Sequence, residues 1–265
     1  MCRWLRERGS NVASVKPDYG LDAPGVVRNL ALGGLAAAVV AAIVQLLPLT
    51  QGDRNIASAW FGLTAFALLV EVGWMLYSSR VGKLRMRGLV IDAVGLRGNE
   101  RVLDVGCGRG LLLIEAAKRL PEGEAVGLDL WSTRDLSVNR PEVALENARL
   151  EGAEKRIRLE TGDMRKMPFE DASFDAAVAS LAIHNVPDRE GRSAAVKEIA
   201  RVLRPGARVA LLDFARTGEY LNTLRGLGWT DVRRTGYSLQ MFPPVRIVLG
   251  SRPAGPPVTQ KGVRC

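Results

Sequence analysis

Two long stretches without charge constrain this chain more than any other feature of its sequence. Residues 29–52 carry no charged side chain, and residues 55–79 carry only one, Glu71. As an α-helix each stretch would be about 36 Å long at roughly 1.5 Å per residue, which exceeds a hydrocarbon core of about 30 Å. Because only the TQGDRN segment separates them, we expect residues 29–79 to form a tight transmembrane helical hairpin.

The residues around the hairpin indicate its orientation. Gly33 and Gly34 offer a small-residue face for close helix contact. Basic residues gather outside both ends of the hairpin, at Arg3, Arg6, Arg8, Lys16 and Arg28 and at Arg80, Lys83, Arg85 and Arg87. The connecting turn carries only Arg54. Since Lys and Arg are enriched in cytoplasmic segments, both ends are expected to be cytoplasmic, including a basic N-terminal segment over residues 1–28.

Other interpretations of this region stay open. The first stretch is rich in alanine and glycine and only moderately hydrophobic, so the two helices could form a soluble cap buried against the main domain. Glu71 is a functional candidate because it is ionisable within an apolar stretch. Its side chain could equally extend to the interface or face the neighbouring helix.

The charge distribution argues against nucleic acid as a partner. The net charge of the 265 residues is +9, but residues 91–224 hold 20 Lys and Arg against 22 Asp and Glu. The excess lies at the two ends, with 10 against 5 in residues 1–90 and 7 against 1 in residues 225–265. A near-neutral middle has no basic stripe for a phosphate backbone, whereas basic ends fit a membrane surface. One histidine and three scattered cysteines exclude a multi-histidine metal site and a disulfide framework, so we expect no metal.

From residue 80 onward the apolar pattern alternates between helix and strand, which is typical of a doubly wound α/β sheet. Helices are expected at 83–96, 111–120, 141–152, 189–203 and 219–229. Strands are expected at 101–105, 124–131, 156–163, 174–183, 207–214, 231–239 and 245–253. We assign residues 80–250 to this domain and residues 251–265, which lack an apolar period, to a disordered tail.

A glycine turn carries the first sign of chemistry. Asp104 is followed by Gly106, Gly108 and Gly110, where a strand ends and a helix begins. Glycines let the backbone approach a ligand, and the helix N-terminus offers free N–H groups. Asp129 ends the next strand, where an acid can accept the hydroxyl protons of a ribose. The G-x-G-x-G spacing differs from the dinucleotide pattern, so an NAD-type oxidoreductase is disfavoured.

On these residues the chain resembles a class I S-adenosylmethionine-dependent methyltransferase, with a domain of type 11/25. Four blocks carry the resemblance in the family's order: VLDVGCGRG, GLDLW, GDMRKMPFEDASFDAAVAS and RVLRPGARVALLDF. They cover about residues 84–250 and are most similar to the ubiquinone/menaquinone-type enzymes. The resemblance implies a Rossmann-like seven-stranded sheet and S-adenosylmethionine as cofactor. One departure is Pro205-Gly206-Ala207 in place of Pro-Gly-Gly, which affects a turn only.

The resemblance also implies roles for individual residues. The methionine part of the cofactor would be held by Asp104, Gly106, Gly108 and Gly110. Asp129 would hold the ribose hydroxyls, and Ser180 would lie near the methionine amine. The adenine would be flanked by Leu130 and Met164, and its amino group would donate to Asp163.

Four other features have alternative interpretations. His184 could act as a base for the acceptor or only line the pocket. Asp213 could face the substrate or cap the next helix. Cys107 lies in the glycine turn with no histidine beside it in the sequence, so a catalytic thiol is disfavoured. Residues 131–140 could form part of a substrate wall or a solvated loop.

These observations predict a membrane-anchored methyltransferase with a cytoplasmic catalytic domain. The acceptor would be a small molecule or a lipid-like molecule, because tethering to a membrane raises the effective concentration of an amphipathic substrate. A membrane protein that binds S-adenosylmethionine or a nucleotide for regulation, without turnover, is the alternative. Neither the methylated atom nor the oligomeric state follows from the sequence.

Overall fold

The computed structural model describes residues 16–132 and 139–254. Arg3, Arg6 and Arg8, the centre of the 131–140 loop and the tail beyond residue 254 therefore lie outside the described residues. The helices are α1 (Pro24–Val44), α2 (Gln51–Tyr77), α3 (Lys83–Val94), α4 (Leu111–Lys118), α5 (Pro141–Leu150), α6 (Arg189–Val202) and α7 (Thr217–Gly226). Short helical turns lie at η1 (Ser78–Gly82), η2 (Glu154–Arg156) and η3 (Ile183–Asn185).

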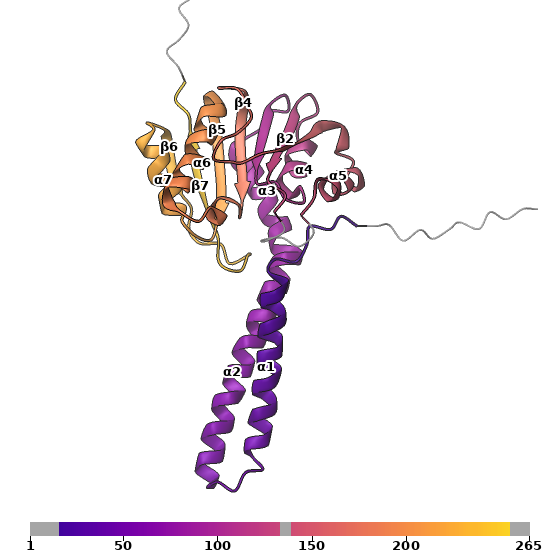
Figure 1. Cartoon of the computed structure of the whole chain (residues 1–265), viewed down its shortest axis with the longest axis vertical. Helices are drawn as coiled ribbons and strands as arrows, with labels where there is room; N and C mark the ends of the chain where they lie inside the picture. The colour runs from indigo at the N-terminus through magenta and orange to yellow at the C-terminus, as the bar shows by residue number, and fades with distance from the viewer. Residues whose placement is uncertain (1–15, 133–138, 255–265) are drawn as a thin grey trace, which may run out of the picture.

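A seven-stranded sheet with the order β3-β2-β1-β4-β5-β7-β6 forms the centre of the domain (Figure 1). Its strands are β1 (Arg101–Val105), β2 (Glu124–Asp129), β3 (Ile157–Thr161), β4 (Phe174–Ser180), β5 (Leu203–Asp213), β6 (Thr230–Arg234) and β7 (Arg246–Ser251). β1 to β5 pair in parallel, while β7 is antiparallel to both β5 and β6. This arrangement confirms the expected Rossmann-like sheet. The last two strands are shorter than expected, because residues 235–245 leave the sheet as a loop.

The strand ends at which the candidate site residues lie are all at one edge of the sheet. β1, β2, β4 and β5 all end at this edge, which we call the carboxyl edge. Asp213, the last residue of β5, pairs with Arg246, the first residue of β7. The loop of residues 235–245 therefore also lies at the carboxyl edge.

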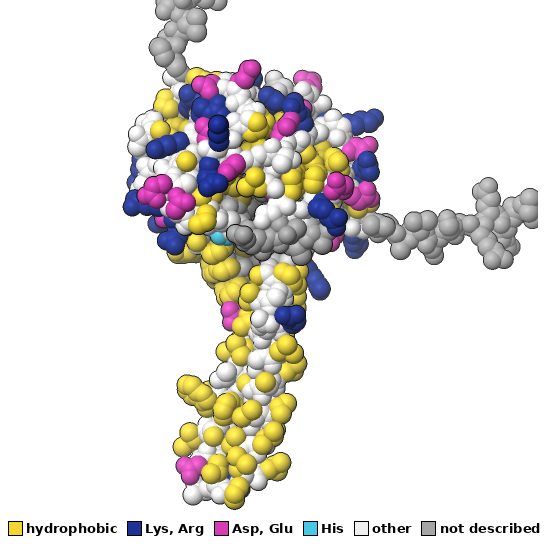
Figure 2. All heavy atoms as spheres, in the orientation of Figure 1, with side chains coloured by type: hydrophobic (Ala, Val, Ile, Leu, Met, Phe, Trp, Pro, Cys, Tyr) yellow, Lys and Arg dark blue, Asp and Glu magenta, His cyan; other side chains and the backbone are white. Residues whose placement is uncertain are grey.

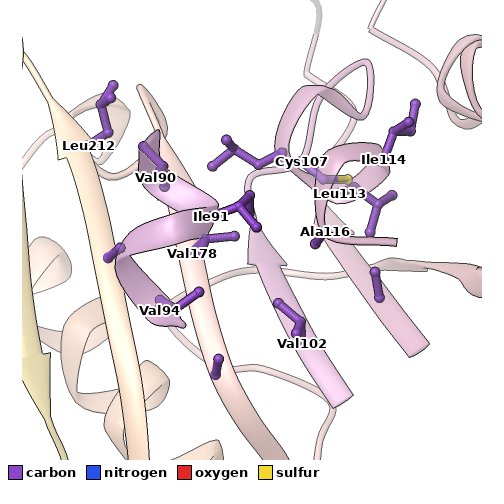
Figure 3. Close-up of a cluster of buried hydrophobic side chains, with 14 of the residues drawn as sticks. Val90, Ile91, Val94, Val102, Cys107, Leu113, Ile114, Ala116, Val178 and Leu212 are labelled. Atoms are coloured by element: carbon purple, nitrogen blue, oxygen red, sulfur yellow. The ribbon is translucent and has the colours of Figure 1, made fainter. Parts of the chain in front are cut away.

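Helices cover both faces of the sheet. α3, α4 and α5 pack on one face, and α6 and α7 pack on the other. Alternate residues of a strand point to opposite faces, so Val102 packs with the first group and Leu103 with the second. Figure 3 shows α3 lying across the sheet, with Val90 and Ile91 directed toward Val178 of β4 and other strand residues. Such close packing fixes α3 relative to the strands.

The two apolar stretches form an antiparallel hairpin that projects from the domain as a stalk (Figure 1). Gly34 is buried between the helices, where a Cβ would lie 3.0 Å from Cγ of Leu69. Apolar side chains cover the stalk in Figure 2, and only 17% of the apolar window of α1 and 6% of that of α2 is buried. The hairpin does not fold back onto the sheet, so the interpretation as a cap buried against the main domain is wrong. Both helices are long and apolar enough to cross a membrane.

The turn of the hairpin lies earlier than the sequence suggested. We expected it at TQGDRN, but α2 already begins at Gln51 and the turn occupies residues 45–50. Pro48 cannot continue α1 because its ring removes a backbone donor. The hydroxyl of Thr50 then accepts a hydrogen bond from the N–H of Asp53 and caps α2. α1 also begins earlier than expected, so Arg28 lies inside it.

A continuous helical path joins the hairpin to the sheet. α2, η1 and α3 follow one another without a break from Gln51 to Val94. The loop of residues 235–245 packs against this junction, where a Cβ on Gly82 would lie 1.7 Å from the carbonyl oxygen of Gln240. The junction thus requires a glycine at position 82.

The variant Gly82→Ala tests this close contact. We expect it to destabilise the protein by about 1–3 kcal/mol, because the added methyl group must displace the loop backbone. Gly88→Ala in α3 is the matched control, since its Cβ would meet its nearest neighbour at an ordinary 3.7 Å. Thermal unfolding of the detergent-solubilised protein, followed by circular dichroism, measures both. Equal unfolding temperatures for the two variants would contradict the contact.

Candidate cofactor and acceptor site

The glycine turn leaves β1 at the carboxyl edge and leads into α4. Gly106, Gly108 and Gly110 have φ angles of +73°, +50° and +86°, a region that favours glycine. A Cβ on Gly106 would lie 2.3 Å from the Cβ of Ala182, just beyond β4. The turn therefore lies directly against the segment that leads to His184.

Asp129 connects the end of β2 to this turn. Its Oδ2 accepts a hydrogen bond of 2.8 Å from the N–H of Gly108. Its Oδ1 accepts from the N–H of Trp131 at 2.7 Å and from Nδ2 of Asn139 at 3.1 Å. The carboxylate is thus held at the mouth of the glycine turn.

Asp104 lies beneath the turn and is almost fully buried. Burial raises the pKa of its carboxyl to about 7, against an ordinary value of 3.8. The N–H of Leu113 in α4 donates to its Oδ2 at 2.8 Å and partly offsets this shift. A cationic ligand beside Asp104 would favour its ionised form.

Cys107 lies under the turn and not in the open site. A Cβ on Gly127 of β2 would lie 2.7 Å from its Sγ. Burial, together with the nearby Asp104 and Asp129, raises the pKa of the thiol well above its usual range. A thiol with so little thiolate is a poor nucleophile, which agrees with the sequence interpretation.

The remaining predicted cofactor residues lie along the same edge. Leu130 is 57% exposed directly after β2. Oδ2 of Asp163 accepts from Nη2 of Arg165 at 2.6 Å, and this hydrogen bond lowers the pKa of Asp163. Met164 lies near Gly106, with its Cε 3.7 Å from the position of a Cβ there. Ser180 is the last residue of β4 and is partly buried.

His184 and Asp213 come together from two different strand ends. Nδ1 of His184 lies 2.9 Å from Oδ1 of Asp213, within ion-pair distance but without the direction of a hydrogen bond. Asp213 is 1% exposed, and the hydroxyl of Tyr220 donates to its Oδ2 at 3.0 Å. The ring of Phe214 lies 4.5 Å from the imidazole. Figure 2 shows the histidine, coloured cyan, on the side of the domain that faces the stalk.

Asp213 does not cap α7, although the sequence left that role open. Arg216 is the residue before the helix, and its side chain makes no capping hydrogen bond. The backbone N–H groups of Phe214 and Ala215 donate to Oδ1 of Asp213 instead. The carboxylate therefore organises the turn after β5.

An N-terminal strap, residues 16–22, contacts the glycine turn and was not predicted from the sequence. Oδ2 of Asp18 accepts from Nη1 of Arg109 at 2.7 Å. Asn147 of α5 exchanges hydrogen bonds with the backbone of Asp18, at 2.8 and 2.9 Å. The ammonium of Lys83 in α3 donates to two strap carbonyls. These partners lie 63 to 129 residues apart in the chain, so no local pattern reveals the strap.

Comparison with known proteins shows that this chain is similar to methyltransferases. Residues 102–206 match the family model of a methyltransferase domain. A demethylmenaquinone methyltransferase of Lactobacillus johnsonii is 31% identical over 159 residues, 59% of this chain and 57% of that protein. A 27-O-demethylrifamycin SV methyltransferase of Amycolatopsis mediterranei is 38% identical over 130 residues, 49% of this chain and 44% of that protein. The chain thus spans about half the length of these relatives.

A solved structure agrees with this class at the level of the fold. A methyltransferase of Methanosarcina mazei, dependent on S-adenosylmethionine, superposes with a TM-score of 0.52 at 19% identity. The alignment covers 63% of this chain and 98% of that one. Residues 102–206 therefore match a methyltransferase domain, and the sheet around them has the Rossmann-like fold of such enzymes.

The variant Asp104→Asn tests the raised pKa of the buried carboxyl. The native state binds more protons than the unfolded state between the unfolded pKa near 3.8 and the native pKa of about 7. This contribution to stability is complete below the lower value and is lost as the pH rises through the upper one. We expect the wild type to lose more thermal stability than the variant between pH of about 5 and about 8. Parallel unfolding temperatures across that range, measured without cofactor, would contradict the shift.

Proposed function

We propose that this protein is a membrane-anchored methyltransferase that transfers the methyl group of S-adenosylmethionine to a lipid-like or other small acceptor. One observation carries the proposal: the carboxyl edge, with the glycine turn and His184, faces an apolar hairpin that the domain itself does not cover (Figures 1 and 2). The distribution of basic residues around the hairpin supports a cytoplasmic catalytic domain.

The residues at the edge fit the cofactor that the family uses. A Cβ on Gly106 would clash with Ala182, so the turn lies close to the end of β4 only because the residue is glycine. Asp104 and Asp129 supply negative charge for a cationic ligand and acceptors for hydroxyl groups. Oδ1 of Asn139 is buried beside Asp129 and has no hydrogen-bond partner within the described part of the chain. A ligand hydroxyl or amine would satisfy this acceptor.

We assign the individual contacts as the family resemblance implies them. The methionine part would lie over Gly106, Gly108 and Gly110 with Asp104 beneath, and its amine would approach Ser180. Asp129 would bind the ribose hydroxyls. Leu130 and Met164 would flank the adenine, whose amino group would donate to Asp163.

The chain's own contribution to the reaction is positioning and proton transfer. The bound cofactor supplies an electrophilic methyl group on a sulfonium, so the protein mainly aligns the acceptor and excludes water. His184 would accept the acceptor's proton at Nε2, because Nδ1 faces Asp213. Asp213, fixed by Tyr220, would orient the imidazole and stabilise its charged form.

The acceptor class follows from the surroundings of the site. The relatives named above act, by their names, on demethylmenaquinone and on 27-O-demethylrifamycin SV. An apolar stalk beside the site favours an acceptor that partitions into a membrane. A regulatory protein without turnover is not favoured, because the cofactor positions are chemically intact and the relatives are enzymes.

The variant Asp129→Ala tests the cofactor site. Loss of hydrogen bonds to a charged group, worth about 1.5–3 kcal/mol each, is expected to weaken S-adenosylmethionine binding by at least about tenfold. Calorimetric titration of the detergent-solubilised protein measures this affinity. Asp171→Ala is the control, because Asp171 has a side chain that is 78% exposed and lies outside the site. Unchanged affinity in Asp129→Ala would contradict the assignment.

The variant His184→Ala tests the proposed base. Removal of a general base is expected to lower the methylation rate by about 10²- to 10⁴-fold, while the affinity for S-adenosylmethionine stays unchanged. Membrane extract supplies the acceptor, and transfer of a radiolabelled methyl group is counted in the lipid and aqueous phases. An unchanged rate would restrict His184 to lining the pocket. Label in the aqueous phase alone would exclude a lipid-like acceptor.

A further inference from the structure

The loop between β6 and β7, residues 235–245, is attached to the end of the stalk. Nε1 of Trp74, near the end of α2, donates to the carbonyl oxygen of Leu239 at 3.0 Å. The N–H of Phe242 donates to Oγ of Ser78 at 2.9 Å. The rings of Trp74 and Phe242 meet edge to face at 5.0 Å. The loop is therefore fixed at one level along the helix.

This level corresponds to the boundary of a membrane that the hairpin would cross. Trp74 lies 23 residues after Gln51, which is about 35 Å along a helix, slightly more than a hydrocarbon core of about 30 Å. Trp74 and Tyr77 are of the residue types that gather at the interface between lipid and water. The charge pattern changes at the same point, because Arg80 and Arg85 follow and both are exposed.

The loop presents side chains suited to that boundary. Tyr237 is 66% exposed and Leu239 is 64% exposed, although both are large and apolar. The guanidinium of Arg246 lies 4.6 Å from the centre of the Tyr237 ring. An apolar body beneath a cationic group is the arrangement by which side chains bridge lipid tails and headgroups. Most of the surface of both side chains is therefore exposed to solvent.

We propose that residues 235–245 form a second membrane contact, in which Tyr237 and Leu239 enter the interfacial layer of the bilayer beside the hairpin. This inference rests on the membrane anchoring proposed above. The loop and the hairpin together hold the domain at two points, so the carboxyl edge lies against the lipid surface. An acceptor dissolved in the bilayer then reaches His184 and Asp213 without crossing bulk water.

Depth-dependent fluorescence quenching in vesicles tests the contact. The full chain carries the changes Cys2→Ser and Cys265→Ser and one new labelled cysteine, while the buried Cys107 stays in place. The three label positions are Leu239→Cys in the loop, Leu63→Cys in the middle of α2, and Glu122→Cys at the opposite edge of the sheet. Each protein is reconstituted in phosphatidylcholine and phosphatidylglycerol with spin-labelled lipids, and circular dichroism confirms its fold.

Three results separate the two proposals. The contact is supported if spin labels near the lipid glycerol backbone strongly quench the Leu239 probe. In the same experiment, spin labels deep in the lipid acyl chains should quench the Leu63 probe, and the Glu122 probe should be unaffected. It is overturned if the Leu239 probe behaves like the Glu122 probe while the Leu63 probe is quenched, and the membrane anchor then stands. Absence of quenching at Leu63 overturns the anchor and the loop contact together.

Discussion

The helical path from Gln51 to Val94 is the constraint on which the rest of the structure depends. Its first part is the apolar α2 and its last part is α3, which packs against the centre of the sheet through Val90 and Ile91. Because a helix is stiff over this length, the stalk cannot turn independently of the sheet. The close contact between Gly82 and Gln240 adds the loop of residues 235–245 to the same rigid junction.

That junction fixes the position of the candidate site relative to the stalk. The glycine turn, Asp129 and His184 all lie at the carboxyl edge, which is where doubly wound sheets bind ligands. The N-terminal strap links this edge to the stalk a second time, since Asp18 contacts Arg109 in the turn and α1 begins only a few residues later. Cofactor site and hairpin are therefore parts of one structural unit, which is the physical basis for proposing a membrane-soluble acceptor.

Much of the fold was predictable because its signals are local. The strand before Asp104 and the glycines after it follow each other within ten residues, and the order of strands and helices repeats the same short pattern. The turn of the hairpin was predicted too late in the chain, because residues 51–55 are mostly polar although they already belong to the start of α2. The last two strands were also predicted too long, because residues 235–239 have strand composition but belong to the loop whose Leu239 carbonyl accepts a hydrogen bond from Trp74 of α2.

The sequence by itself determined the sheet, the glycine turn and the acid at position 129. It also determined two helices that are more apolar than helices packed on the domain need to be. These features depend on periodicity and on residue chemistry, both of which can be read from the order of residues in the chain. Only the tertiary structure decided that Asp213 faces His184, that Asp18 reaches Arg109 and that Leu239 lies beside Trp74. Those pairs are 29, 91 and 165 residues apart, and contacts at such separations arise from packing, which no local pattern encodes.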